Sequence, residues 1–439
     1  MAAKTVAEAG LEVCLIDRKG EEDIGKKVCG DAIGKHHFDD LGLDYPTGEE
    51  LERRIVGAKL YSPNLETVFH VKSEALFGFM VNRHSFGQRL LREAMDAGAT
   101  LLESNQALKP IISGGVVAGV LVKDLKRGSK AELRGRVVVD ASGFSAVLRK
   151  KLPPEFGIDV EISKGDMVIC YREIRELKEQ VADPEYIGLY FNQAITLGGY
   201  YWIFAEGGAK VNVGLGLVMS DEFPNPKKQL YNHVLPQPLF ERSSIVSGGG
   251  GHIPTRRPLD CMVGDGIVVV GDAACQANPI HGGGMGPSMI GGTAAGKTII
   301  EAIERGDVSR GGLWPYNARY IRSYGAKQAG LDVLRTFLLN WLNDDDLNYG
   351  MKYRLITEGD LLKASMGEDT RLNITEATLR VFKGLGRLSF LRRLRNAVNL
   401  MREVKALYLD YPASPQGFHE WKMKVHELFE KAGRKKGRS

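Results

Sequence analysis

The chain has 439 residues, a length typical of two to three domains. Its 59 basic and 54 acidic residues leave a formal net charge of +5, and five basic residues fall in the segment 431–439. The rest of the chain is close to neutral, which argues against a nucleic-acid-binding protein. The apolar fraction of 43% excludes a disordered chain.

Targeting and metal-binding signals are absent from the sequence pattern. No apolar run reaches the roughly 20 residues needed to cross a bilayer, and the first ten residues lack the apolar part of a secretory signal. The cysteine count is odd without CxxC spacing, so we expect no disulfide framework, no metal site and a cytoplasmic location. HExxH, GxSxG and Walker A motifs are also absent, which leaves the commonest hydrolase and NTPase functions without support.

The first residues have the pattern of a dinucleotide-binding unit without its beginning. A helical pattern ends near Gly10, and a buried strand at 13–16 leads to Asp17. In dinucleotide-binding folds such an acid holds the adenosine ribose, although an acid after a strand is often only a turn or cap residue. The preceding strand and its Gly-x-Gly-x-x-Gly turn, roughly 15–20 residues, are expected to be missing.

Further along the chain, the pattern changes from α/β to antiparallel β. Residues 82–98 predict a helix, 100–108 a strand, 116–139 a hairpin, and 136–140 a buried strand. Long alternating strands follow over 155–255, most clearly at 186–191 and 199–218. The glycines at 248–251 predict a loop.

The α/β pattern returns with a strand at 267–270 and a helix over 287–304, and residues 312–432 are mostly helical. We therefore expect an α/β domain formed by residues 1–154 and 256–311. A β-rich substrate domain, 155–255, is inserted into it, and residues 312–439 form a helical domain with a basic tail. Ligands usually bind where such domains meet.

A glycine-rich loop is the strongest chemical signal. Gly271-Asp272 follows a buried strand, and the three glycines 282–284 precede a helix. Asp272 can accept a hydrogen bond from a ribityl hydroxyl, and bare backbone admits a flat ring. The helix N-terminus favours negative charge, such as that of a reduced flavin. The alternative is a turn that only separates two helices.

An aromatic strand is a second candidate for ligand binding. Period two places Tyr200, Trp202 and Phe204 on one face, opposite the strand that contains Gly214 and Gly216. Such a stripe suits a long apolar ligand or an ordinary core, and glycines within a strand favour close approach by a ligand.

Two weaker patterns leave alternatives open. Cys29-Gly30 would let backbone approach a cofactor, or Cys29 is an ordinary buried cysteine. Residues 387–409 predict an amphipathic helix with a basic side, which suits an anionic membrane surface or the solvated face of a helical domain.

Taken together, these motifs resemble those of the FAD-dependent geranylgeranyl reductases, in particular the archaeal digeranylgeranylglycerophospholipid reductases. A YxWxFP signature followed by GxG is matched at residues 200–205 and 214–216, with Ala205 in place of proline. The other matching segments are Cys29-Gly30-Asp31, Asp140–Gly143, Pro254–Leu259, Gly271–Gly286 and Asn343–Gly350.

The resemblance implies a fold of the α/β + β class: a para-hydroxybenzoate-hydroxylase-like FAD-binding domain with an inserted antiparallel sheet and a helical C-terminal part. The substrate-binding residues it implies are Tyr200, Trp202 and Phe204. The FAD-binding residues it implies are Asp17, Cys29, Gly30, Arg83, Ala107, Asp272, Gly284 and Met285.

The implied reaction is reduction of isolated C=C bonds in the geranylgeranyl chains of an ether-lipid precursor, at the inner face of the cell membrane. The electron donor is a nicotinamide, a deazaflavin or a ferredoxin, and the proton donor is open among Cys29, His281 and Tyr200. The alternatives are a flavin monooxygenase on the same scaffold and an inactive lipid-binding relative. A halogenase would carry a WxWxIP-like segment, which this sequence lacks.

Overall fold

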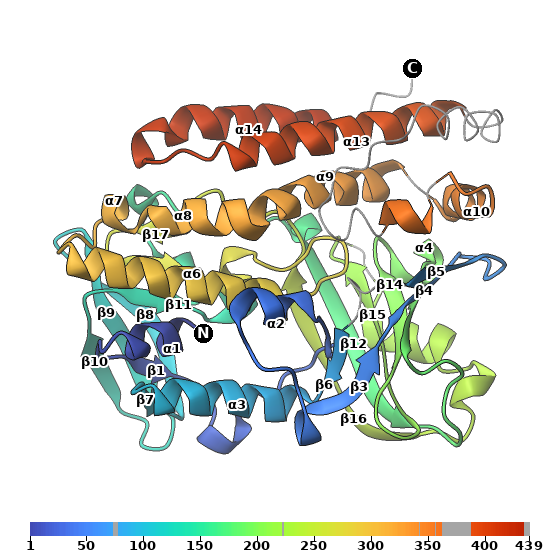
Figure 1. Cartoon of the computed structure of the whole chain (residues 1–439), viewed down its shortest axis with the longest axis horizontal. Coiled ribbons are helices and arrows are strands. Elements are labelled where there is room, and N and C mark those ends of the chain that lie inside the picture. The colour runs from blue at the N-terminus through green and yellow to red at the C-terminus, as the bar shows by residue number, and fades with distance from the viewer. Residues whose placement is uncertain (73–77, 222–223, 342, 356, 362–387, 434–439) are drawn as a thin grey trace.

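The computed structural model describes residues 1–439 except 73–77, 222–223, 342, 356, 362–387 and 434–439. Helices α13 (Leu388–Leu409) and α14 (Phe418–Gly433) lie over α9 (Ala326–Trp341), and the sheets lie beneath α9 (Figure 1). The predicted helical C-terminal part is confirmed for the described residues. The remainder of that segment, 362–387 and 434–439, lies outside them.

The parallel strands of the α/β part form two separate pairs. Strand β1 (Cys14–Ile16) pairs with β7 (Thr100–Leu102), and β11 (Val138–Asp140) pairs with β18 (Ile267–Val269). Strand β17 (Val263–Gly264) completes the second group. Within the described residues no ladder joins β1 to β11. Residues of both β1 and β11 line one large cavity.

Close helix packing explains several glycines of the α/β part. Helix α1 (Ala2–Glu8) lies against α6 (Met285–Glu304). A Cβ atom on Gly292 would lie 3.1 Å from the Cβ of Met1, and one on Gly296 would lie 2.7 Å from the Cβ of Thr5. The small residues of α6 therefore allow α1 to approach its backbone.

The remaining elements of the α/β part follow the predicted pattern. Helix α3 (Arg83–Asp96) buries Phe86, Leu91 and Ala94 on one stripe. Strands β8 (Asn105–Ser113), β9 (Val116–Asp124) and β10 (Lys130–Arg134) form an antiparallel sheet that contains the predicted hairpin. Strands β2 (Ala32–Gly34), β6 (Gly78–Val81) and β3 (Leu51–Ile55) form another, beside α2 (His36–Leu41).

The β-rich part is one sheet of seven strands, and only its β13–β4 pair is parallel. The sequence places residues 57–72 in the first α/β segment, whereas the structure adds them to this sheet. The order is β16 (Ser244–Pro254), β12 (Met167–Glu176), β15 (Lys210–Val218), β14 (Tyr200–Ala205), β13 (Tyr186–Tyr190), β4 (Gly57–Tyr61) and β5 (Val68–Lys72).

The predicted loop at Gly248–Gly251 is wrong. These residues continue β16 and pair with β12, Gly248 opposite Glu173 and Gly251 opposite Cys170. At Gly249 the lack of a side chain has a packing reason, because a Cβ atom there would lie 2.6 Å from Val28. The strand pairing outweighs the weak β propensity of glycine.

The C-terminal helices share the core of the α/β part. The Tyr408 hydroxyl donates to the Asp260 carboxylate at 2.9 Å, and the Tyr411 hydroxyl donates to the Asp260 carbonyl at 2.7 Å. Helices α7 (Arg310–Leu313) and α8 (Pro315–Tyr320) precede α9, and α10 (Asp344–Lys352) follows it. These bonds connect the end of α13 firmly to the segment that follows β16.

Helix α13 confirms the predicted helix. Neither predicted role, on a membrane surface or as a solvated outer face, describes it completely. Its apolar residues Leu394, Val398 and Met401 line the large cavity, so they face the interior rather than lipid. Its basic residues Arg392 and Arg395 are exposed and also border this cavity. Among the described helices, none is both long and apolar enough to cross a membrane.

Candidate functional site

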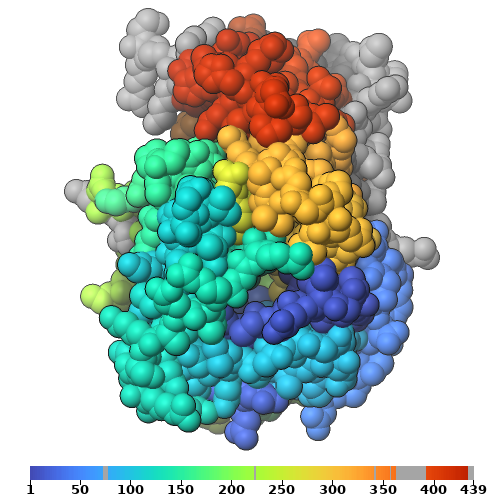
Figure 2. Space-filling view, turned by 90° about the vertical axis from the view of Figure 1, so that its left-hand side faces the viewer, coloured from blue at the N-terminus to red at the C-terminus, as the bar shows by residue number. Residues whose placement is uncertain are grey.

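A cavity of about 2940 Å³ lies where the α/β part, the seven-stranded sheet and helices α9 and α13 meet. Small-molecule sites usually measure roughly 300–1,000 Å³, so this cavity has room for a large cofactor and a long substrate together. A hollow bordered by the dark-blue N-terminal residues and a teal segment is visible in Figure 2. All eleven sequence-predicted site residues line this cavity.

Asp272 marks the point where β18 ends and the glycine-rich loop begins. It lies in a 3-10 turn, Gly271–Ala274, and Lys27 Nζ donates to its Oδ2 at 3.1 Å. A Cβ atom on Gly284 would lie 3.3 Å from Asp272 Oδ1. The carboxylate therefore stands beside the first residues of α6, where a hydroxyl-bearing ligand chain would meet both.

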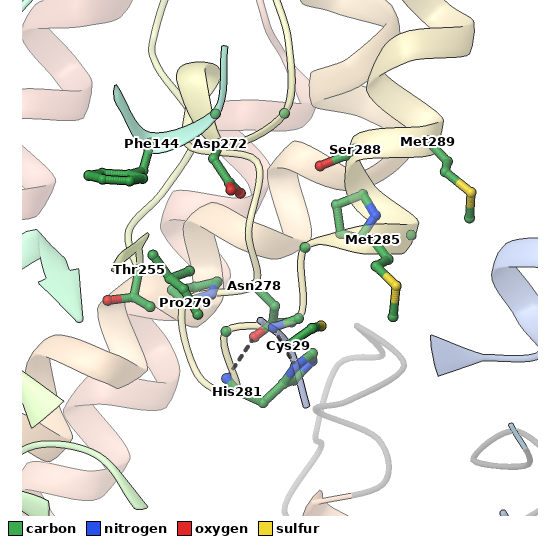
Figure 3. Close-up of a pocket in the computed structure, with 18 of the residues that line it drawn as sticks. Cys29, Phe144, Thr255, Asp272, Asn278, Pro279, His281, Met285, Ser288 and Met289 are labelled. Carbon is green, nitrogen blue, oxygen red and sulfur yellow. Dashed lines mark hydrogen bonds between the residues drawn. The ribbon is translucent and has the colours of Figure 1, made fainter. Parts of the chain in front are cut away.

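The loop between Asp272 and α6 is held by its own side chains. Asn278 Oδ1 accepts from the backbone N–H groups of Ile280 at 2.9 Å and His281 at 3.3 Å (Figure 3). Asn278 Nδ2 donates to the Tyr324 hydroxyl at 3.2 Å. This brings the three glycines to the N-terminus of the 20-residue helix α6, which begins at Met285. The helix dipole at that end favours an anionic ligand group.

Asp17, Arg83 and Ala107 also line the cavity. Asp17 follows β1, and its Oδ1 accepts from the Lys19 backbone N–H at 2.9 Å. Arg83 is the first residue of α3, and its Nε is buried with no hydrogen-bond partner among the described residues. Because Arg83 lines the cavity, its guanidinium is suited to an acceptor-rich ligand.

The aromatic strand is at once core and cavity wall, so the two predicted roles are compatible. Trp202 is 7% exposed and Phe204 6%, yet both line the cavity with Tyr200. The Trp202 ring centroid lies 6.0 Å from that of Tyr200 and 6.1 Å from that of Phe204. A Cβ atom on Gly214 would lie 2.5 Å from the Trp202 ring, which explains that glycine.

Cys29 and Gly30 lie beside the aromatic strand. A Cβ atom on Gly30 would lie 3.3 Å from the Phe204 ring, so a larger residue would require the ring to shift by a few tenths of an ångström. Burial raises the pKa of the Cys29 thiol and of the Tyr200 phenol, so both keep their protons at neutral pH. Burial lowers the pKa of His281 to about 4, so its ring is neutral there.

A polar network behind Cys29 was not predicted. Asn212 Nδ2 donates to the Cys29 carbonyl at 2.9 Å and to Asp31 Oδ2 at 3.0 Å, while Asn212 Oδ1 accepts from Trp202 Nε1 at 2.9 Å. Arg172 Nε donates to the same carbonyl at 3.2 Å. The available signal was an asparagine and an arginine within otherwise apolar strand patterns.

Phe144 is a second residue that the prediction missed. It is exposed at 41%, lines the cavity, and stacks on His252 with ring centroids 4.9 Å apart. Its place after the Asp140–Gly143 motif was the available signal. Figure 3 shows it on the same side of the cavity as Asp272.

The fold is shared with solved flavin-dependent proteins. A geranylgeranyl bacteriochlorophyll reductase-like protein from Thermoplasma acidophilum superposes with a TM-score of 0.76 at 22% identity, covering 90% of this chain and 95% of that one. A flavin-dependent brominase has a TM-score of 0.61 at 16% identity, covering 98% and 96%. The architecture thus defines a flavoprotein-type fold.

Sequence comparison is more specific. Residues 166–253 match the model of the geranylgeranyl reductase catalytic domain. The chain is 42% identical over 431 residues to a digeranylgeranylglycerophospholipid reductase of Sulfolobus acidocaldarius, covering 97% of this chain and 94% of that protein. The identity to one from Methanothrix thermoacetophila is 31% over 351 residues, covering 79% and 86%. The chain belongs to the digeranylgeranylglycerophospholipid reductase family.

Proposed function

We propose that this protein is an FAD-dependent oxidoreductase that saturates the isolated C=C bonds of geranylgeranyl chains in archaeal ether-lipid precursors. Family membership supports the substrate class. The observation that carries the proposal is that one cavity joins the glycine loop before α6 to the aromatic strand β14. A flat cofactor and a long apolar chain can therefore lie in contact.

The described residues fit the flavin half of FAD. Asp272 would bind the ribityl chain, and Gly284 and Met285 would lie against the ring. A Cβ atom on Gly284 would crowd the Asp272 carboxylate even without a ligand. The unpartnered Nε of Arg83 suits a cofactor acceptor, and Asp17 would bind the adenosine ribose. When bound there, a reduced flavin would supply hydride chemistry for the alkene.

We propose a para-hydroxybenzoate-hydroxylase-like arrangement of the domains. The FAD-binding domain would comprise residues 1–154 and 256–311, apart from the strands that join the large sheet.

The chain's own residues would align the substrate and exclude water. An isolated alkene has no carbonyl group to polarise it, so the reaction depends on close positioning in a dry site. Trp202 and Phe204 would provide an apolar wall, and Gly30 packs closely against the Phe204 ring. The Cys29 thiol and the Tyr200 phenol remain protonated in this wall, whereas neutral His281 is a weaker candidate for proton donation.

The protein must also reach its lipid and its electron source. We propose peripheral contact with the inner face of the cell membrane, with the exposed Arg392 and Arg395 of α13, which also border the cavity, near anionic lipid. The electron donor would be a nicotinamide, a deazaflavin or a ferredoxin.

The direct test supplies the chain with FAD, dithionite and vesicles that contain a geranylgeranyl ether lipid, and follows the lipid by mass spectrometry. The proposal expects a gain of two hydrogens for each double bond. An oxygenated product that depends on O₂ would instead indicate a monooxygenase. Bound but unchanged lipid would indicate an inactive relative. Replacing dithionite by each of the three donors in turn would then identify the electron source.

A further inference from the structure

Lys327 is a cation in the cavity wall without a carboxylate partner. It is the second residue of α9. Its Nζ lies 5.4 Å from the centre of the Tyr324 ring, and no carboxylate oxygen of the described residues lies within 4.0 Å of it. Arg335 of the same helix also lines the cavity, but it donates to Asp332 at 2.8 Å and to Asp166 at 2.7 Å. Lys327 therefore brings to the cavity a positive charge that no described ion pair neutralises.

Lys327 lies at one end of an apolar stripe on α9. Four residues at helical spacing line the cavity from one face of this helix: Lys327, Leu331, Leu334 and Leu338. The leucines extend the stripe about 16 Å from Lys327 along the helix axis. Helix α13 adds further apolar residues to the same cavity. A charged end followed by a long apolar wall matches an amphiphile with an anionic headgroup.

Three histidines lie near Lys327 in the cavity wall. The ring centroids of His36 and His37 are 3.9 Å apart, and that of His37 lies 6.2 Å from that of Tyr324, the ring that Lys327 contacts. Asn278 connects Tyr324 to the third histidine, because it donates to the Tyr324 hydroxyl at 3.2 Å and accepts from the His281 backbone N–H at 3.3 Å. Lys327, His36, His37 and His281 all line the cavity and form its basic cluster.

We propose that Lys327 binds the phosphate of the glycerophospholipid substrate, at the end of the α9 stripe, while the isoprenoid chains lie against the apolar walls. The proposal rests on the proposed reduction of the lipid and deepens it, since it assigns the residue that distinguishes a phospholipid from a free isoprenoid alcohol. A lysine ammonium group is a common phosphate ligand in proteins. The imidazole rings of the basic cluster supply neighbouring N–H donors.

The electrostatics of Lys327 agree with an anion site. Burial lowers the pKa of Lys327 to about 8, Lys405 acts in the same direction, and Asp40 opposes them. The ammonium group still carries its charge at neutral pH, but it does so at a cost, because the charge is buried without a counter-ion. A bound phosphate would supply that counter-ion.

The histidines of the basic cluster are neutral. Burial lowers the pKa of His36, that of His37 to about 3 and that of His281 to about 4, and Lys327 contributes to each of these shifts. A neutral imidazole donates one N–H without adding a second positive charge next to the lysine. Lys327 is therefore the single residue of the cluster whose charge attracts an anion, which makes it the position to change.

The first experiment measures lipid binding without reaction. The full chain, in excess FAD, is titrated with detergent micelles that contain either a saturated diether glycerophosphate or the same diether glycerol without phosphate, and tryptophan fluorescence reports binding. Wild type should prefer the phosphate lipid. Lys327→Met should bind that lipid about tenfold or more weakly, the usual effect of losing a bond to a charged group, and should bind the diether glycerol as wild type does. Lys327→Arg should keep much of the preference.

Lys297→Met is the matched control, because it removes an exposed lysine of α6 that lies outside the cavity, and it should change neither affinity. Equal binding of the two lipids by wild type would overturn the proposal. So would an equal loss of both lipids in Lys327→Met, which would show that the lysine only supports the shape of the cavity.

The second experiment follows lipid saturation with FAD and dithionite, and compares a geranylgeranyl glycerophospholipid with geranylgeraniol, which has no phosphate. Lys327→Met should raise KM for the phospholipid about tenfold or more with little change in kcat, and should leave both constants for geranylgeraniol unchanged. The affinity for FAD, measured by flavin fluorescence, should equal that of wild type. A loss of FAD affinity in Lys327→Met alone would assign the basic cluster to the cofactor and overturn the proposal. If wild type reduces neither substrate, the proposed function fails, while the binding experiment still decides whether Lys327 holds the phosphate.

Discussion

The Tyr200 hydroxyl donates a hydrogen bond to the His281 carbonyl at 2.7 Å, across 81 positions of the sequence. This bond joins the aromatic strand of the seven-stranded sheet to the glycine loop of the α/β part. Each segment alone has an ordinary structural explanation, either as core or as a turn. Their contact across the cavity is what makes a combined cofactor and substrate site the better explanation for both.

Asp272→Ala should weaken flavin retention. A hydrogen bond to a charged group contributes roughly 1.5–3 kcal/mol, which corresponds to about tenfold or more in the dissociation constant. Flavin fluorescence titration of the purified chain measures this. Asp221→Ala is the control, because that exposed carboxylate only pairs with Lys164 at the surface. Equal flavin affinity in both variants would contradict the assignment of Asp272.

Gly284→Ala should reduce flavin binding without unfolding the protein. The backbone there has φ −115°, which alanine adopts freely, but the new Cβ atom would lie 3.3 Å from Asp272 Oδ1 and face the cavity. Gly165→Ala is the matched control, since a Cβ atom at that position meets nothing within 4 Å. Both variants should keep the melting temperature of wild type, and only Gly284→Ala should lose cofactor.

Trp202→Phe should affect both stability and lipid saturation. The change removes the donor to Asn212 Oδ1, which costs about 1–3 kcal/mol when a buried acceptor is left unpaired. Trp314→Phe removes a comparable bond, from Trp314 Nε1 to the Pro412 carbonyl, at a site outside the cavity. Melting temperatures should fall in both variants. A lipid saturation rate that falls equally in both would show that Trp202 belongs to the core alone.

Glu206→Gln should stabilise the protein at high pH only. The pKa of Glu206 is raised from 4.5 to about 7, so folding opposes its ionisation. This penalty is absent below pH 4.5, grows between pH 4.5 and 7, and reaches on the order of 3 kcal/mol above that. Urea unfolding at pH 8 and at pH 4.5 tests it. A gain of equal size at both pH values would show that charge is not the cause.

The local patterns predicted local structure well. The helix stripe of α3, the hairpin of β14 and β15, and the order Gly271-Asp272, glycine loop, α6 all follow from short-range periodicity and turn residues. The resemblance of short motifs then selected residues that line one cavity. These features depend on neighbours in sequence, which is why the sequence alone reveals them.

The predictions that failed concern features that depend on contacts between segments far apart in the sequence. Gly248–Gly251 form a strand because β12 lies beside them, and residues 57–72 join the large sheet by a parallel pairing with β13. Asn212 is visible only as a polar residue in an apolar strand until the fold brings it to the Cys29 carbonyl. Local periodicity does not reveal which distant segment a strand or side chain will pair with.

The division of the parallel strands into two separate pairs has a consequence for local unfolding of the protein. β1 and β7 share only three paired positions, whereas β12 and β15 share nine. Short two-stranded ladders are marginal, and local unfolding starts where few bonds hold a segment. The end of the molecule that contains Asp17 should therefore open before the aromatic sheet does. A ligand that bridges the two pairs would stabilise the weakest part of the fold, which makes the thermal resistance of the whole chain a measure of cofactor loading.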